Sequence, residues 1–286
     1  MVSRIGIGLA ACFLAAVPSA AQEVIRFETS VGDFDMVLNP TNDARLQGHT
    51  ENMLRYIEDN RYRSSWINRA PENFVLQMGG FYSHTRRPPP TIDSTRGVVP
   101  FEPVGGAPAV ETGLSNTFGT VALALPSDNF NNPLQDAGTN SFFINLASNT
   151  FLDPNFTVFA AIPDMTVINE IMSLMQIDRT IDPIFGAGSN NAAFQDVPIQ
   201  DNGFQVFIDR AFVVVDPLEV ARARAGAQSI VAMASQNSES PSSAPQLATA
   251  AVVPEPASAI AFLLGLCGLG ACCVRRKRPT QRRLME

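Results

Sequence analysis

The sequence predicts a mainly β domain, and the pattern of apolar and polar residues in three stretches supports this. Residues 24–38 form two alternating runs around Gly32, which is typical of a hairpin with glycine in its turn. Residues 74–77 alternate before a pair of glycines, which indicates a strand with one buried face followed by a bulge or a sharp turn. Residues 119–125 are mostly apolar and are therefore expected to form a buried strand.

Two helices are expected among these strands. Thr50 can cap the first helix, in which Met53, Leu54 and Ile57 form one apolar face. His49 stands just before it, where a solvated or capping role is expected. Three further segments complete the predicted order: a helix at 165–175, a polar, glycine-containing insertion at 178–203 and a closing strand at 204–215.

Length and composition limit the kinds of function. The 286 residues fit one domain of roughly 150–200 residues with extensions, and the net charge of -7 argues against nucleic acid as a partner. The four cysteines lie at position 12 and at 267, 272 and 273, all outside the expected soluble part. The two histidines, His49 and His84, have no metal-ligand spacing. We therefore expect no cofactor, no metal, no disulfide scaffold and no cysteine or histidine chemistry.

The first 21 residues have the pattern of a secretory signal peptide. Arg4 provides the positive charge, residues 5–17 form the apolar core, and small residues at 19–21 provide a cleavage site before Gln22. The alternative is a membrane anchor, which the short apolar stretch disfavours.

Residues 82–115 are rich in proline and glycine and include an Arg-Arg pair before three prolines. This composition favours turns and extended backbone over helix. We interpret the segment as a loop at the rim of the domain, and the alternative is a peptide-recognition motif.

The most informative stretch, residues 66–81, reads WINRAPENFVLQMGGF. It resembles the signature of the cyclophilin-type peptidyl-prolyl isomerases, whose bacterial members carry a sequence similar to FIHRSVPGFVIQGGGF. Arg69 falls on the catalytic arginine of that family, Phe74 and Val75 on pocket residues, and Gln77 on the pocket glutamine. Taken alone, the stretch also fits an ordinary β-hairpin with a surface arginine.

Four more blocks resemble the same family in the same order. They are TENMLRY at 50–56, SFFIN at 141–145, FLD at 151–153 and TVF at 157–159. Agreement across residues 24–216 favours the family over the plain hairpin. The resemblance implies a closed barrel of eight antiparallel strands with two capping helices, formed by residues 22–216.

The resemblance also implies a site and an activity. Arg69 would donate towards the prolyl nitrogen of a proline-containing peptide segment, Gln77 would hold the substrate backbone and orient Arg69, and no cofactor would be needed. The residues expected to contact substrate are Phe74, Val75, Gln77, Leu123, Ser141, Phe143, Phe151 and Leu152.

Several positions depart from the family pattern. Met78 replaces a glycine, Ser141 a glutamine and Leu125 an asparagine, while Phe151 and Phe156 stand at tryptophan and histidine positions. Lost polar groups should weaken substrate binding. We therefore expect a slow isomerase, and the alternative is a catalytically weak, cyclophilin-like peptide-binding surface protein.

The C-terminal part predicts where the protein acts. Residues 217–251 are expected to form a flexible linker that includes a short helix at 219–233. Residues 252–286 contain VPEP, an apolar segment at 257–274 long enough to span a membrane, and then Arg-Arg-Lys-Arg. This resembles the PEP-CTERM sorting signal, which implies recognition by an exosortase and cleavage near the PEP motif. A plain tail anchor is the alternative, and both place the domain outside the cytoplasmic membrane, in the envelope or the extracellular space.

Overall fold

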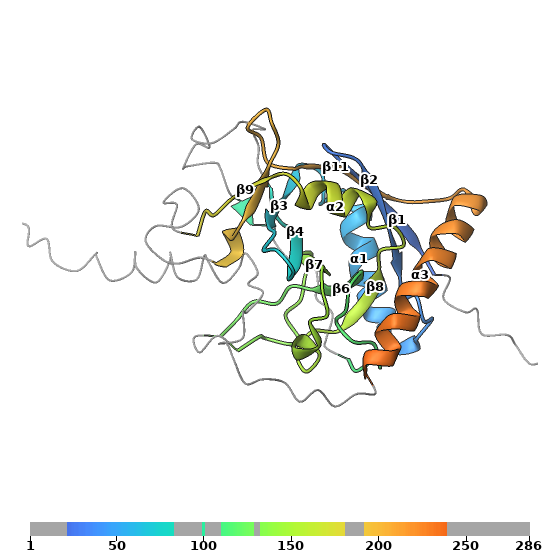
Figure 1. Ribbon diagram of the computed structural model, residues 1–286. Helices are drawn as coiled ribbons and strands as arrows, with labels where there is room; N and C mark the ends of the chain where they lie inside the picture. The colour runs from blue at the N-terminus through green and yellow to red at the C-terminus, as the bar shows by residue number, and fades with distance from the viewer. Residues whose placement is uncertain (1–21, 83–98, 101–109, 129–131, 181–191, 239–286) are drawn as a thin grey trace, which may run out of the picture.

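The structure, a computed structural model, describes residues 22–82, 99–100, 110–128, 132–180 and 192–238 (Figure 1). The predicted signal peptide, most of the proline-rich loop and the predicted sorting signal lie outside these ranges. The strands of the main sheet are β1 (Val24–Thr29), β2 (Asp33–Leu38), β3 (Ser65–Arg69), β4 (Val75–Tyr82), β5 (Val99–Pro100), β6 (Thr120–Leu123), β7 (Phe142–Asn145), β8 (Val158–Ala161) and β11 (Ile208–Val213).

Eight of these strands follow one path, β11-β1-β2-β8-β6-β7-β4-β3, with antiparallel neighbours, and β5 adds to β4. The two ends of the path approach each other. The amide of Ile67 donates to the carbonyl of Val206 at 3.0 Å, and Ser64 donates to Ile208 at 2.9 Å. These bonds nearly close the sheet into a barrel, which removes exposed strand edges. The predicted eight-stranded barrel is confirmed.

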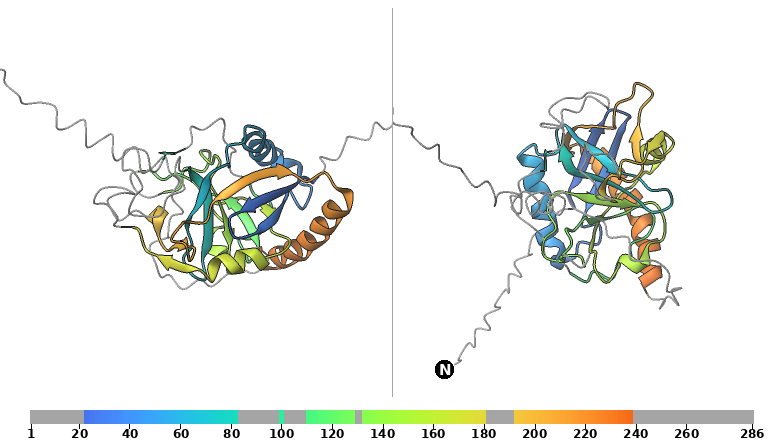
Figure 2. Two further views of the ribbon diagram at one scale, coloured as in Figure 1. Left: turned by 90° about the horizontal axis from the view of Figure 1, so that it is seen from above. Right: turned by 90° about the vertical axis from the view of Figure 1, so that its left-hand side faces the viewer.

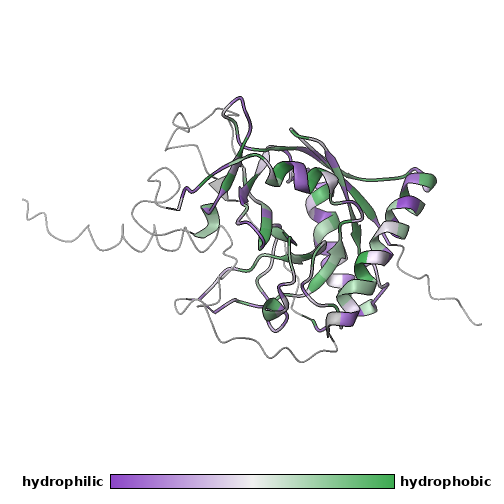
Figure 3. Cartoon of the chain, viewed as in Figure 1, coloured by the Kyte–Doolittle hydropathy of each residue, from purple (hydrophilic) through white to green (hydrophobic). Residues whose placement is uncertain are grey.

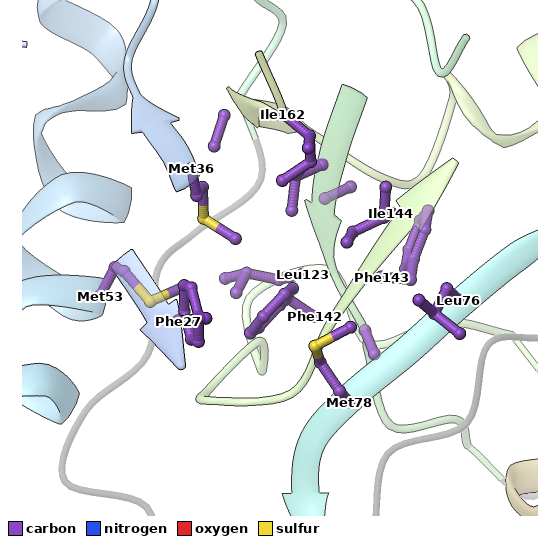
Figure 4. Close-up of a cluster of buried hydrophobic side chains, with 14 of the residues drawn as sticks. Phe27, Met36, Met53, Leu76, Met78, Leu123, Phe142, Phe143, Ile144 and Ile162 are labelled. Atoms are coloured by element: carbon purple, nitrogen blue, oxygen red, sulfur yellow. The ribbon is translucent and has the colours of Figure 1, made fainter. Parts of the chain in front are cut away.

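Alternating apolar side chains fill the barrel. Phe142 points inward, with its ring centroid 5.4 Å from that of Phe27 and 5.9 Å from that of Tyr62. Figure 4 shows Met78 and Leu123 beside Phe142 in this cluster. Because successive residues of a strand point to opposite faces, the next residue, Phe143, points out of the barrel.

Helices α1 (Gln47–Glu58) and α2 (Thr166–Met172) lie on opposite sides of the barrel (Figure 2). α1 buries Met53, Tyr56 and Ile57, and α2 buries Ile168 and Ile171. The described residues also contain the 3-10 turns η1 (Ala44–Leu46), η2 (Thr150–Leu152) and η3 (Ala192–Phe194), and a small sheet of β9 (Met175–Ile177) and β10 (Val197–Ile199).

The first helix starts earlier than predicted. Thr50 lies within α1, and its hydroxyl donates to the carbonyl of Leu46 at 3.2 Å. The capping role belongs instead to Asp43, whose carboxylate accepts the amide hydrogen of Arg45 at the start of η1. The 3-10 turn thus leads directly into α1 and moves its start towards the N-terminus.

A third helix, α3 (Pro217–Ser238), covers one outer wall of the barrel, where the sequence predicts a linker with a shorter helix. The carboxylate of Asp216 accepts the amides of Leu218 and Glu219 at 2.9 and 3.0 Å, and proline fits the first helical position. Figure 3 shows hydrophobic and hydrophilic residues mixed along α3, in contrast to the largely hydrophobic strands. The helix approaches closely, since a Cβ at Gly226 would lie 2.8 Å from Pro163.

Small apolar residues form the contact beneath α3. They are Val24, Val37, Ala161 and Val214 of the barrel, with Ala223, Ala227 and Ile230 of the helix. A packed helix therefore replaces the first two thirds of the predicted linker. None of the helices in the described part of the chain is long and apolar enough to cross a membrane, and the predicted segment 257–274 lies outside that part.

Candidate active site

One row of side chains crosses four neighbouring strands on the outside of the barrel. In the strand register, Arg69 of β3 faces Gln77 of β4, Gln77 faces Phe143 of β7, and Phe143 faces Ala122 of β6. Directly opposed residues of antiparallel strands place their side chains on the same face. The signature arginine, the signature glutamine and the phenylalanine of a distant block therefore meet on one surface.

Arg69 is buried, with only 1% of its surface exposed. Its guanidinium carbon lies 5.2 Å from the centroid of the Phe74 ring, and one terminal nitrogen donates to Gln195 Oε1 at 3.2 Å. Burial lowers the pKa of Arg69 to about 10, and the nearby carboxylate of Asp196 acts in the opposite direction. The side chain therefore remains a charged donor at neutral pH.

Gln77 and Ser141 form a polar pair beside the arginine. The amide nitrogen of Gln77 donates to Ser141 Oγ at 3.3 Å, and both side chains are fully buried. Ser141 stands where the family pattern has a second glutamine, so the shorter side chain is paired within the protein. Met78, in contrast, does not lie on the site face, because it faces Phe142 in the barrel core. Its extra bulk compared with glycine does not enter the site face.

Two aromatic pairs border this row. Phe74 stacks on Phe151, with ring centroids 5.9 Å apart, and Phe151 is 53% exposed. Phe143 packs edge-on against Phe156 at 5.5 Å. Leu152 follows Phe151 in η2 and is buried. Phe74, which directly precedes β4, thus packs in one apolar cluster with Phe143 and Leu152, next to Arg69.

Leu123 differs from the prediction that it lines the apolar slot. It faces Phe142 in the register of β6 and β7, and Figure 4 shows it pointing with Phe142 into the barrel core. The neighbouring residue, Ala122, occupies the site face instead. The reason is the two-residue period of the strand, which sends adjacent side chains to opposite faces.

A buried polar network borders the apolar region on the same face of the sheet, and the sequence patterns did not reveal it. Asn145 donates to Asn116 Oδ1 at 3.1 Å and to Thr120 Oγ1 at 3.0 Å, while Asn149 donates to Asn145 Oδ1 at 2.9 Å. Asn149 also donates to the carbonyl of Phe74 at 2.8 Å. This asparagine network of Asn116, Asn145 and Asn149 therefore joins β7, the segment before η2 and the pocket phenylalanine.

The segment that contacts Arg69 was also missed. Residues 192–199 fall within the predicted polar insertion, yet Phe194 stacks on Trp66 at 5.9 Å and lies 4.7 Å from Phe81. Apolar residues at 194, 197 and 199 were the signal that could have indicated packing. Within the described ranges, no group of three or more His, Cys, Asp or Glu side chains is placed to hold a metal.

Comparisons with known proteins identify the family of the chain. A model of the family described as cyclophilin type peptidyl-prolyl cis-trans isomerase/CLD matches residues 24–201. The chain is 29% identical over 180 residues to a peptidyl-prolyl cis-trans isomerase of Acinetobacter baylyi, covering 61% of this chain and 84% of the relative. It is 26% identical over 187 residues to peptidyl-prolyl cis-trans isomerase B of Escherichia coli, covering 62% and 94%.

A solved cyclophilin-type isomerase of Cryptosporidium parvum aligns with a TM-score of 0.44 at 16% identity, over 68% of this chain and 99% of that one. The family match extends over more than half of the chain and includes Arg69, Phe74, Gln77 and Phe143. The chain belongs to the cyclophilin-type peptidyl-prolyl cis-trans isomerases.

Proposed function

We propose that this chain catalyses prolyl isomerisation through Arg69 and the apolar region beside it, on exported or envelope proteins. Rotation about an X–Pro bond faces a barrier of roughly 18–20 kcal/mol because amide resonance must be broken. In the twisted state the prolyl nitrogen becomes pyramidal and can accept a hydrogen bond. A guanidinium is suited to this state because it stays charged and only donates.

The proline ring needs an apolar slot next to that donor. Phe74, Phe143 and Leu152 border the apolar region, and Val75 lies on the same face of β4 as Gln77. Held there, the ring would bring its nitrogen towards Arg69, while Gln77, which is buried and bonded to Ser141, lies beside the arginine in the same row. A preorganised donor of this kind typically lowers a barrier by about 2.7–4 kcal/mol.

The observation that carries this proposal is the row of Arg69, Gln77 and Phe143 across neighbouring strands. These residues come from two blocks more than 60 positions apart in the sequence. A structural barrel wall needs apolar residues there, and it gains nothing from a desolvated guanidinium.

The test is an isomerisation assay of Arg69→Ala on a proline peptide. We expect the rate enhancement to fall by at least about ten-fold, since removal of a preorganised donor typically costs about 10²–10³ in rate. Arg63→Ala is the matched control, since Arg63 is an exposed arginine six positions earlier in the chain. Equal rates for wild type and Arg69→Ala, with both folded, would refute the role of Arg69.

A second function is favoured by the burial of the site. Arg69, Gln77 and Phe143 are almost fully covered, and Leu125 and Ser141 stand where the family has amide side chains. These features favour a weak catalyst that retains a peptide-binding role on the cell surface. Peptide binding by wild type without rate enhancement would establish this alternative.

The place of action rests on the sequence of the two ends. The signal-peptide pattern at 1–21 and the PEP-CTERM pattern at 252–286 support export, with the membrane and an exosortase as partners of the tail. Fractionation of cells that produce the full chain or a chain ending at 251 tests this. We expect loss of envelope association when residues 252–286 are removed, and a cytoplasmic full chain would refute export.

A further inference from the structure

The segment of residues 192–199, comprising η3, Gln195, Asp196 and β10, is fixed on the outside of β3. Its apolar anchor is Phe194, which packs against both Trp66 and Phe81. On its other side, the amide of Arg179 donates to the carbonyl of Phe194 at 3.0 Å. The segment is therefore held by its own core cluster, independently of the residues of the proposed site.

The segment is hydrogen-bonded to the residue before Arg69 and to the residue after it. Asn68 donates its side-chain amide to the carbonyl of Ala193 at 2.7 Å, and the amide of Ala70 donates to the carbonyl of Gln195 at 3.1 Å. Between these two anchors, the guanidinium of Arg69 donates to Gln195 Oε1 at 3.2 Å. The residue that supplies the acceptor, Gln195, is therefore held in place by its own backbone bond to Ala70.

We propose that Gln195 is a positioning residue that fixes the rotation of the Arg69 guanidinium for prolyl isomerisation. The proposal rests on the proposed function of Arg69. A guanidinium has five donors in a rigid plane, so one fixed acceptor together with a ring on its face determines where the other donors point. Phe74 supplies that ring at 5.2 Å.

Asp196 contributes charge to the same arrangement. It has a left-handed backbone conformation, with φ of 54°, which aspartate tolerates better than most residues. Its carboxylate favours the charged form of Arg69, while Asp178 is the further acidic group that acts on Asp196. Gln195 and Asp196 thus supply an oriented acceptor and a negative charge beside the buried guanidinium of Arg69.

The experiment compares Gln195→Leu, Gln195→Glu and Gln200→Leu in the full chain, with kcat and KM measured separately on a proline peptide. Gln200 is the matched control, because it is the glutamine directly after this segment, and its side chain bonds to Ser30 and to the carbonyl of Gln205. We expect Gln195→Leu to lower kcat by about ten-fold with little change in KM, since a hydrogen bond to a charged group is lost. Gln195→Glu keeps an acceptor and should retain most of kcat.

A second measurement follows the rotation of the Arg69 guanidinium directly. Nitrogen-15 NMR of the Arg69 side chain should show separate signals for its terminal nitrogens in wild type and Gln195→Glu, because rotation is restrained. In Gln195→Leu these signals should average. Unchanged kcat and unchanged signals in a folded Gln195→Leu would overturn the positioning role.

The two proposals fail separately. If Arg69→Ala loses activity and Gln195→Leu does not, Arg69 remains catalytic and only the role of Gln195 is refuted. If Gln195→Leu changes the Arg69 signals while Arg69→Ala keeps full activity, the positioning exists but the proposed mechanism is wrong. A parallel loss of kcat in Gln200→Leu would show a structural effect of the segment and would overturn the specific role of Gln195.

Discussion

The two outer walls of the barrel are covered in different ways. We call β1, β2 and β8 under α3 the helix wall, and β3, β4, β7 and β6 the site wall. The helix wall is sealed by small apolar residues such as Val37, Ala161 and Ala227. The site wall buries Arg69, Gln77 and Asn145 on its outer face, each with hydrogen-bonding partners.

This difference separates stability from function. Burial of apolar surface stabilises a fold without requiring specific partners. Burial of an amide or a guanidinium costs free energy unless its polar atoms are hydrogen-bonded. Buried polar side chains of this kind therefore indicate a role other than stabilising the fold. The helix wall is therefore the stabilising wall, and the site wall is the one on which the proposed reaction would take place.

Removal of α3 should have the largest effect of any change to these walls. A chain that ends at Asp216 exposes Val24, Val37 and Val214 to water. We expect a loss on the order of 4 kcal/mol in the free energy of unfolding, since each buried Val or Ile contributes about 1.5–3 kcal/mol. Urea unfolding measures the loss, and the activity of the folded fraction should be unchanged.

A chain that ends at Ser238 is the matched control, because it keeps α3 and lacks only residues 239–286. It should unfold at the same urea concentration as the full chain. Equal stability of the chains that end at 216 and 238 would show that α3 does not stabilise the helix wall.

Acid should lower the free energy of unfolding through His49, which lies in α1 and packs on the barrel. His49 is buried and its ring stacks on Phe159 of β8 at 5.7 Å; burial lowers its pKa from 6.5 to about 4. The unfolded chain therefore binds a proton between these pH values that the folded chain does not, so stability falls as the pH drops from 6.5 to 4. The full effect corresponds to about 3 kcal/mol.

The measurement is urea unfolding at pH 7 and pH 4.5 for wild type and His49→Phe. The phenyl ring preserves stacking on Phe159 and takes no proton, so the variant should lose less stability on acidification. Carboxylates with lowered pKa, such as Asp164, destabilise both proteins alike and cancel in the comparison. An equal loss in both would mean that His49 is protonated in the folded state.

The sequence predicted the fold well because barrel strands have a local signature. Alternation in 24–38 and 74–77 produced β1, β2 and β4 in the observed places. The linker prediction for 217–251 differed from the packed helix at 217–238 for a physical reason. The alanines that pack α3 on the barrel carry little hydrophobic signal of their own, and their role depends on the wall they meet.

The site residues that lie on strands could be predicted from the sequence. The register places Arg69, Gln77 and Phe143 in one row because a two-residue period fixes their faces. The same period, applied strictly, would have placed Leu123 in the core. Gln195 could not be found this way, because its contact with Arg69 joins residues 126 positions apart through a segment without regular pattern.

The asparagine network offers the sharpest comparison of the two walls. Asn145→Ala removes the donor to Asn116 Oδ1 and to Thr120, and it leaves the Asn149 side chain without its acceptor in β7. We expect a loss of about 2 kcal/mol in the free energy of unfolding, because the buried Asn116 Oδ1 loses the Asn145 donor and the Asn149 amide loses one of its two acceptors. KM for a proline peptide should also rise several-fold, since Asn149 holds the carbonyl of Phe74.

Val37→Ala is the matched change in the helix wall. It removes two buried methyl groups beneath α3 and should cost a similar amount, about 2 kcal/mol, through lost apolar burial and the cavity left behind. Its KM should stay at the wild-type value, because the strand neighbours of Val37 are Val24 and Ala161, which both belong to the helix wall. Equal KM changes in the two variants would mean that stability alone controls the site. A rise of KM only in Asn145→Ala would show that the asparagine network fixes the position of Phe74 in the apolar region.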